Sequence, residues 1–126
     1  MDKEFVKFRI AVATSDGIVV NQHFGRADKF TIYDINQDNT IDYKEERVVA
    51  PVCQGGVHDE LKLKESVSYL TDCKYVLVSR IGQGAINALE QGGINPMELP
   101  GVIEESIRRL VAYDEVQYQW LWKWRL

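Results

Sequence analysis

A cysteine and a histidine flank two glycines in the segment Cys53-Gln-Gly-Gly-Val-His58. Thiolate sulfur and imidazole nitrogen are ligands for zinc, copper and iron-sulfur clusters. The glycines, Gly55 and Gly56, let the backbone bend and expose its N–H groups, and the start of a following helix favours a bound anion. A structural zinc site needs four ligands, so this pair leaves two interpretations open. One is an incomplete site for a metal or a sulfide cluster, and the other is a buried cysteine beside a histidine at a helix start.

His23 and Arg26 occur in a second glycine-containing segment, which lies between two predicted strands and reads Asn21-Gln-His-Phe-Gly-Arg-Ala27. In one interpretation His23 is a third metal ligand and Arg26 balances the charge of an anionic ligand. In the other, His23 is a partly exposed residue that covers the core. The residues by themselves do not decide between the two.

Other reactive positions carry weaker signals. Cys73 precedes a predicted buried strand, where a free cysteine packs as a small hydrophobic residue. Gly82-Gln-Gly84 has the position of a phosphate-binding turn, but it lacks the third glycine of a dinucleotide site. A hydrolase or transferase with Cys53 as nucleophile and His58 as base would need a residue that orients the imidazole, and the pattern indicates none.

The first half of the chain predicts the strands that frame these segments. Residues 8–13 form a predicted strand, and a turn at Asp16-Gly17 leads back into residues 18–20 as a hairpin. Residues 30–35 alternate with period two, and residues 40–49 are strand-like after a set of turn residues. We expect these strands to be mostly antiparallel.

The second half alternates helices and strands. A helix begins near Asp59, and a continuously apolar strand of the kind buried on both faces follows at residues 74–79. Residues 85–91 form a short helix that ends at a glycine pair, and residues 94–99, with Pro96, form an edge strand. Apolar residues on one side of the first helix are Leu61, Leu63, Val67 and Leu70, and those on a last helix are Ile103, Ile107, Leu110 and Val111. The pattern predicts an α/β protein with a mixed sheet and helices packed on it.

Length and composition predict one domain over residues 1–126, with a core at about residues 8–113. Hydrophobic residues at 45% and charged residues at 27% are typical of a soluble globular protein, and no apolar run is long enough to cross a bilayer. The N-terminus lacks the features of a secretory signal, so we expect a cytoplasmic protein with two unpaired cysteines. A net charge of -4 without a basic cluster in the body of the chain argues against nucleic acid as a partner.

All three tryptophans lie in the last part of the chain, within a tail at residues 114–126. Large aromatic side chains bury well, so a short strand or helix folded over the core is the first expectation for Tyr118 to Leu126. The alternative is an exposed aromatic and basic segment that docks on a partner or on a second copy of the chain, as in a homodimer.

Four segments taken together resemble the nitrogenase iron-molybdenum cofactor-binding family. They are Ile10-Ala-Val-Ala-Thr-Ser-Asp-Gly17, Val20-Asn-Gln-His-Phe-Gly-Arg-Ala27, Cys53-Gln-Gly-Gly-Val-His58-Asp-Glu60 and Leu77-Val-Ser-Arg-Ile-Gly-Gln-Gly-Ala85. Their order and spacing also fit, and the resemblance covers roughly residues 8 to 112. It is greatest to the version of the domain found in the radical enzyme of cofactor assembly and in stand-alone homologues.

The resemblance implies a ribonuclease H-like fold with a five-stranded mixed sheet, which binds a cluster and has no ribonuclease or other enzymatic activity. It implies that His23, Cys53 and His58 ligate an iron-sulfur or iron-molybdenum-type cluster, with Gly55, Gly56 and Arg26 shaping the site. The cargo would be loosely held and passed between donor and acceptor proteins, because an unsaturated ligand shell leaves positions for the acceptor. A metal-free interaction or regulatory module on the same fold is the alternative.

Overall fold

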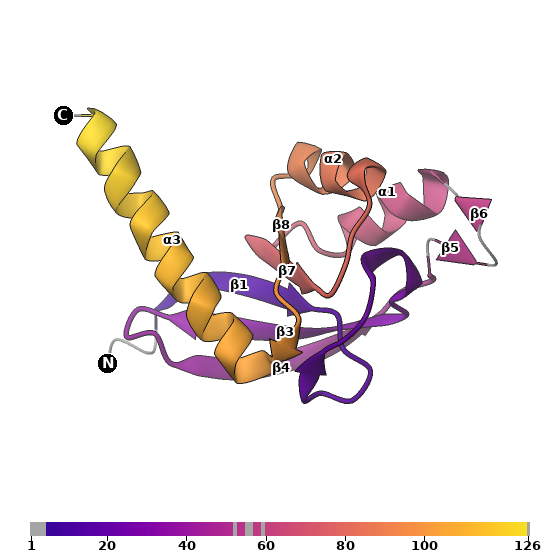
Figure 1. The fold of residues 1–126 in the computed structure, drawn as a ribbon, viewed down its shortest axis with the longest axis horizontal. Helices are drawn as coiled ribbons and strands as arrows, with labels where there is room; N and C mark the ends of the chain where they lie inside the picture. The colour runs from indigo at the N-terminus through magenta and orange to yellow at the C-terminus, as the bar shows by residue number, and fades with distance from the viewer. Residues whose placement is uncertain (1–4, 52, 55–56, 59, 126) are drawn as a thin grey trace.

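The computed structural model describes residues 5–51, 53–54, 57–58 and 60–125, and it describes side chains for all of these except residues 53–54, 57–58 and 122–125. Within these residues one mixed sheet has the strand order β4-β3-β1-β7-β8 (Figure 1). Its strands are β1 (Val6–Val12), β3 (Lys29–Asn36), β4 (Ile41–Val48), β7 (Tyr75–Val78) and β8 (Asn95–Glu98). The prediction of a mixed five-stranded sheet with helices packed on it is confirmed.

The central strand β1 has neighbours of opposite direction. β3 pairs with it antiparallel and continues into the β3–β4 hairpin, whereas β7 pairs with it parallel and β8 pairs parallel with β7. The helices α1 (Glu60–Ser68) and α2 (Gln83–Gln91) provide the crossover connections that parallel strands require. As predicted, β8 is an edge strand and contains Pro96, whose missing N–H costs no ladder bond there.

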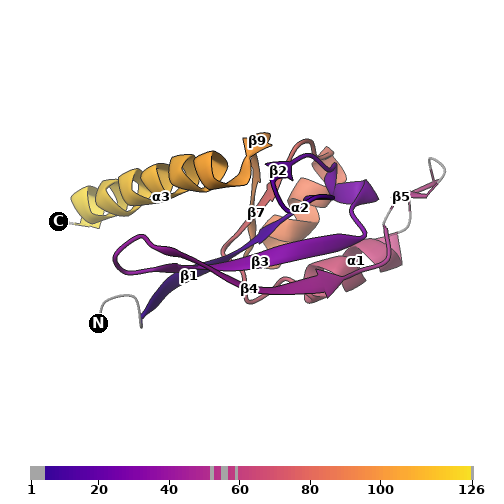
Figure 2. The ribbon, with the colours of Figure 1, turned by 90° about the horizontal axis from the view of Figure 1, so that it is seen from below.

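The central strands β1 and β7 are buried on both faces, and alternate residues of each strand enter different cores. Ile10 and Leu77 belong to the core shared with α3 (Ile103–Arg125), and Ala11 and Val76 belong to the core shared with α1 and α2. All four side chains are 0% exposed. Figure 2 shows α1 and α3 on opposite sides of the sheet. A strand buried on both faces reads as a continuous apolar run, which is the signal that predicted β7.

The prediction that the chain opens with a hairpin is wrong. The short strand β2 (Val19–Val20) pairs with β9 (Gly101–Val102) in a separate two-stranded sheet, not with β1. The physical reason is that both edges of β1 are already occupied, by β3 and by β7. The turn at Gly17 does exist, with φ at +76°, but it redirects the chain toward the start of α3, where the Ile103 N–H donates to Ile18 O at 2.9 Å.

One predicted core residue of the first helix lies outside the core. Leu63, Val67 and Leu70 are buried, whereas Leu61 is 77% exposed. Leu61 precedes Leu63 by two residues, which places it on the opposite side of a helix with 3.6 residues per turn. The prediction of the helix itself is confirmed.

The described side chains at residues 118–121 do not fold over the core. The described part of the tail continues α3 as one helix, which projects beyond the sheet in Figure 1. Tyr118, Trp120 and Leu121 are 62%, 53% and 56% exposed, whereas Ile107 and Leu110 in the first half of the same helix are fully buried. No helix in the described ranges has both the length and the apolar character that crossing a bilayer requires.

Three elements meet at Asp72, in the connection between α1 and β7. Its carboxylate accepts hydrogen bonds from Arg47 of β4 at 2.6 and 2.8 Å and from Arg9 of β1 at 2.8 Å. Arg9 also donates to Asp34 of β3 at 2.7 Å. The guanidinium of Arg47, followed by that of Arg9, holds the pKa of the Asp72 carboxyl well below its usual range.

We expect Asp72 to make stability depend on pH. Because its pKa is lower in the folded than in the unfolded chain, its contribution is complete above about pH 5 and is lost as the pH falls through about 4 and below. Asp72→Asn therefore lowers the free energy of unfolding at pH 7 by only about 1 kcal/mol, because the side chain is 41% exposed and solvent screens the pairs. Chemical denaturation of wild type and Asp72→Asn at pH 7 and pH 3 measures this difference.

The control for this experiment is Glu90→Gln, which removes an exposed acid on α2. The stability gap between Asp72→Asn and wild type must shrink at pH 3, while Glu90→Gln follows wild type at both pH values. An equal gap at pH 7 and pH 3 would contradict the assigned ion pairs.

We also expect the tail to contribute little to stability. Removing residues 118–126 changes the free energy of unfolding by less than about 1 kcal/mol, because the described side chains it removes are mostly exposed. Leu110→Ala, on the buried half of the same helix, costs about 2–5 kcal/mol. Thermal melting of both variants makes the comparison, and a truncation as damaging as Leu110→Ala would show that the tail packs on the core.

Candidate functional site

The segment that carries His23 and Arg26 leaves the carboxyl end of β1. The turn after β1 is organised by Asp16, whose Oδ1 accepts the backbone N–H groups of Ile18 and Val19 at 2.9 and 3.0 Å. These hydrogen bonds lower the pKa of the Asp16 carboxyl. Asn21 then accepts the Ser15 N–H at 3.0 Å and donates to its hydroxyl at 2.9 Å, so the chain returns to this edge in a defined conformation.

A one-turn helix, η2 (Phe24–Arg26), holds His23 at the surface. His23 is its N-cap residue, and the Arg26 N–H donates to His23 O at 3.1 Å. Phe24 is 2% exposed and packs against Phe30 of β3 with ring centroids 5.7 Å apart. Because Phe24 fixes the turn to the core, His23 and Arg26 remain exposed.

The backbones of Cys53 and His58 are paired in a short two-stranded sheet. β5 (Cys53–Gln54) and β6 (Val57–His58) pair antiparallel, with Cys53 opposite His58 and Gln54 opposite Val57. Residues opposed in this way have Cα atoms about 4.5–5.5 Å apart. The two residues whose spacing in sequence suggested a site, Cys53 and His58, are therefore also paired through their backbones.

The hairpin and the His23 segment are neighbours. β5 contacts η2, although the two are separated along the chain by the whole β3–β4 hairpin. The segments that carry His23, Arg26, Cys53 and His58 thus meet at one end of the molecule, beside the start of α1 (Figure 1).

Part of the predicted site lies outside the described residues. Gly55 and Gly56 are among the undescribed positions, and the side chains of Cys53 and His58 are also outside the description. Among the side chains that are described, no group of three or more His, Cys, Asp or Glu residues could hold a metal ion. The ligand roles of His23, Cys53 and His58 therefore stay predictions.

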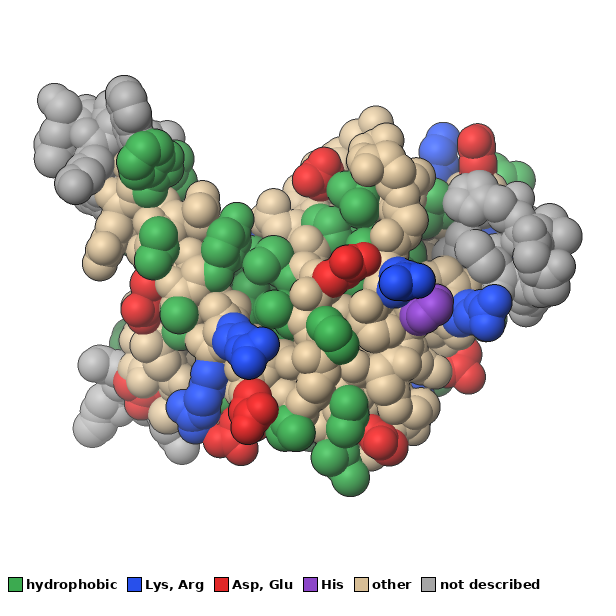
Figure 3. All heavy atoms as spheres, viewed as in Figure 1, with side chains coloured by type: hydrophobic (Ala, Val, Ile, Leu, Met, Phe, Trp, Pro, Cys, Tyr) green, Lys and Arg blue, Asp and Glu red, His purple; other side chains and the backbone are tan. Residues whose placement is uncertain are grey.

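Arg80 joins this site and was not predicted. It lies two residues after the end of β7 and forms a parallel β-bridge with His23, in which the Phe24 N–H donates to Arg80 O at 3.0 Å. The side chains of His23, Arg26 and Arg80 are all exposed. Figure 3 shows how basic, acidic and histidine side chains are distributed over one face of the molecule. The signal in the sequence is a basic residue at the carboxyl end of a buried parallel strand, where ligands bind in many α/β proteins.

The second cysteine is a core residue. Cys73 is 3% exposed and packs in the same core as Leu70 and Val76. Burial raises the pKa of its thiol to about 12, and the neighbouring Asp72 carboxylate adds to this effect. A thiol that stays protonated at neutral pH is a poor metal ligand and a poor nucleophile, so the structure assigns Cys73 to packing.

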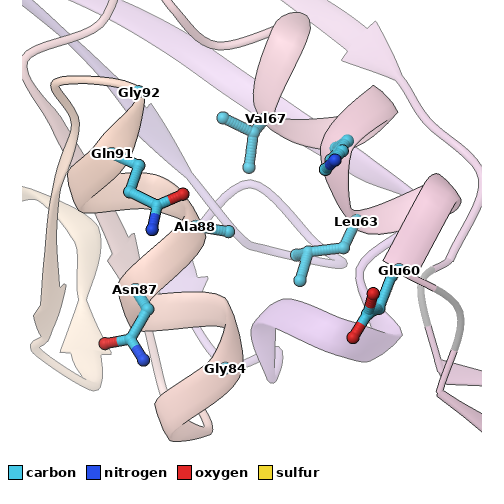
Figure 4. Close-up of a pocket in the computed structure, with 9 residues that line it drawn as sticks. Glu60, Leu63, Val67, Gly84, Asn87, Ala88, Gln91 and Gly92 are labelled. Atoms are coloured by element: carbon cyan, nitrogen blue, oxygen red, sulfur yellow. The ribbon is translucent and has the colours of Figure 1, made fainter.

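A groove of about 370 Å³ runs between α1 and α2. Leu63 and Val67 of α1 and Ala88 of α2 point into it, and Glu60 and Asn87 lie at its rim (Figure 4). None of the described residues predicted for the site lines this groove. The groove is therefore a separate surface feature, and the first residue of α1, Glu60, lies at its rim.

Most of the chain is similar to proteins of one family. The family described as "Dinitrogenase iron-molybdenum cofactor" matches residues 6–113. A curated relative from Frankia alni, "FeMo cofactor biosynthesis protein NifB", is 38% identical over 106 residues, which are 82% of this chain and 21% of the relative. A relative of the same name from Chlorobaculum tepidum is 35% identical over 98 residues, which are 78% of this chain and 22% of the relative. The chain thus spans about a fifth of the length of these relatives.

Solved structures share the fold. The crystal structure of PH0822 has 27% sequence identity and a TM-score of 0.57, and the match covers 82% of this chain and 90% of that chain. An NMR structure of a Thermotoga protein has 22% identity and a TM-score of 0.55, with 83% and 88% of the two chains covered. At this identity the second likeness shows the fold alone.

We expect the Cys73 thiol to resist alkylation in the folded protein. In a Cys53→Ala background, where Cys73 is the only cysteine, iodoacetamide at pH 8 should modify it more than about a hundredfold more slowly than a free thiol. Unfolding in denaturant should restore the ordinary rate. Mass spectrometry over time measures both rates, and rapid labelling of the folded protein would contradict the buried position.

Proposed function

The chain belongs to the dinitrogenase iron-molybdenum cofactor family, and from that premise we propose that it binds and carries an iron-sulfur-type metal cluster during metallocluster assembly. The family relates the chain to the biosynthesis of the iron-molybdenum cofactor. Carriage of a cluster, with or without molybdenum, is the more specific step. The cluster is cargo, which the protein takes from one protein and gives to another.

One observation carries the proposal. Cys53 and His58 oppose each other in the β5–β6 hairpin, and β5 contacts the turn that His23 caps. Residues far apart in sequence, of the types that ligate iron-sulfur clusters, therefore come from adjacent backbone segments. The exposure of His23 supports a site that a partner protein can reach.

The number of ligands suits a carrier. A thiolate from Cys53 and imidazoles from His23 and His58 would leave some cluster positions without a protein ligand. An acceptor protein can add its own ligands at those positions before the carrier releases the cluster. The transfer is then a ligand exchange, and it needs no catalytic group on this chain. We accordingly propose that the protein is not an enzyme.

The proposal extends to fold class, partners and location. The order β4-β3-β1-β7-β8, antiparallel on one side of β1 and parallel on the other, supports assignment to the ribonuclease H-like class. The partners would be proteins that donate and accept the cluster, and the compartment would be the cytoplasm, where thiolate ligands stay reduced.

Reconstitution tests the proposal directly. Wild type is incubated anaerobically with ferrous iron and sulfide, and in parallel with a preassembled iron-sulfur cluster. Retained iron, sulfide and visible absorption are then measured after gel filtration. We expect wild type to retain a chromophore, Cys53→Ala to lose most of it, and His23→Ala and His58→Ala to release it faster, because each substitution removes a ligand.

Cys73→Ala is the matched control, because it also removes one of the two thiols but from the core. It should retain the cluster as wild type does, although it melts at a lower temperature. If Cys53→Ala retained as much cluster as Cys73→Ala, Cys53 would not be a ligand. If wild type retained neither form of the cluster, the protein would be a metal-free interaction module.

A further inference from the structure

Arg80 and Arg26 both lie close to His23 through backbone contacts. Arg80 bridges to His23 through the backbone, and Arg26 follows it by one turn of η2. All three side chains are exposed. The two arginines are therefore backbone neighbours of the residue that would ligate a bound cluster.

Neither arginine has an acidic partner among the described residues, although the chain carries a net charge of -4. Three of the other arginines do: Arg9 pairs with Asp34 at 2.7 Å, Arg47 with Asp72 at 2.6 Å and Arg108 with Glu104 at 2.8 Å. An acid at the same edge, Glu98, uses its carboxylate to accept the Ile81 N–H at 2.9 Å. Two cationic side chains at one edge of an acidic protein are thus available to interact with a bound anion.

Two buried side-chain atoms next to His23 and Arg80 also lack hydrogen-bond partners within the described structure. The buried side-chain atoms that lack a hydrogen-bond partner, within the part of the chain that the structure describes, are Gln22 Oε1 and Ser79 Oγ. These residues precede His23 and Arg80 directly, and the Ser79 N–H donates to Gln22 O at 3.0 Å. Buried polar atoms are normally satisfied, so this junction leaves polar groups for water or a ligand to complete.

The topology favours a ligand at this edge. β1 and β7 are parallel neighbours. After β1 the chain continues to β3 on one side of the pair, and after β7 it continues through α2 to β8 on the other side. Such a divergence opens a crevice at the carboxyl ends of the strands, where α/β proteins bind ligands. Arg80 lies at the carboxyl end of β7, and the His23 segment lies against it.

We propose that Arg80 and Arg26 form an anion-recognition site that binds the sulfide edge of a polyanionic metal-sulfide cluster beside the cluster ligands. The inference rests on the proposed function. It specifies that the cargo is negatively charged and that Arg80 and Arg26 recognise this charge. Bridging sulfides and thiolate ligands give such clusters a net negative charge. A guanidinium does not ligate the metal, but it attracts an anion and donates several hydrogen bonds in a fixed plane.

The two kinds of residue then act at different steps. The arginines would attract the anion over a distance that salt limits, and they would favour clusters of higher negative charge. The thiolate and imidazoles would form the bonds to the metal. Loss of the arginines should therefore weaken binding mainly at low ionic strength, whereas loss of Cys53 should weaken it at every ionic strength.

The test uses the full chain and two probes, a preassembled iron-sulfur cluster and tetrathiomolybdate, which is a coloured metal-sulfide dianion. Titrations at low and high sodium chloride compare wild type with Arg80→Gln, Arg26→Gln and the double variant. We expect the double variant to bind both probes about tenfold more weakly at low salt, and the difference to shrink at high salt. Arg108→Gln, an arginine that is already paired on α3, should bind as wild type does.

The outcomes separate this inference from the proposed function. Equal binding of both probes by wild type and the double variant at low salt would overturn the anion site and leave carriage in place. Binding of tetrathiomolybdate that depends on the arginines, in a protein that retains no cluster, would support the anion site and overturn carriage. Failure of wild type to bind either probe would overturn both. Circular dichroism of each variant confirms that the fold is unchanged.

Discussion

The pairing of β1 constrains the rest of the structure. This strand is buried on both faces and paired on both edges, antiparallel to β3 and parallel to β7. A parallel neighbour requires a crossover, and burial of both faces requires helices on both sides of the sheet. The placement of α1 and α2 on one face and α3 on the other follows from this one strand. Because β3 and β7 lie on different sides of β1, the chain also leaves the carboxyl ends of β1 and β7 in different directions.

At this carboxyl edge of the sheet, a well-packed backbone carries the exposed side chains of His23, Arg26 and Arg80. Phe24 is buried against Phe30, Asp16 and Asn21 fix the preceding turn, and the backbone of Arg80 pairs with the His23 segment. These interactions use backbone groups, the Phe24 ring and the Asp16 and Asn21 side chains, and they do not use the His23 imidazole or the guanidinium groups of Arg26 and Arg80. A binding surface can then change its ligand preference at little cost to stability. Binding residues are often found on loops that a rigid scaffold positions in this way.

Local patterns in the sequence predicted the elements that depend on local or fully buried residues. The apolar run of β7, the β3–β4 hairpin and the edge position of Pro96 all follow from alternation or backbone chemistry. The partner of β2 depends on which edges are already occupied, which no local pattern encodes. The site shows the same division, because spacing identified Cys53 with His58, whereas Arg80 joins His23 only through a long-range β-bridge.

Charge links the site to the rest of the molecule. The ion pairs around Asp72 tie β1, β3 and β4 to the connection before β7, and they neutralise arginines whose role is structural. Arg26 and Arg80 have no such partners among the described residues, and they lie together in a chain with an excess of acids. A cationic patch on a negative protein attracts an anionic cargo locally, while the remaining surface repels it. Such a protein would orient its cargo before any metal-ligand bond forms. Part of the binding then comes from charge, so fewer metal-ligand bonds are needed to hold a cluster that the carrier must later release.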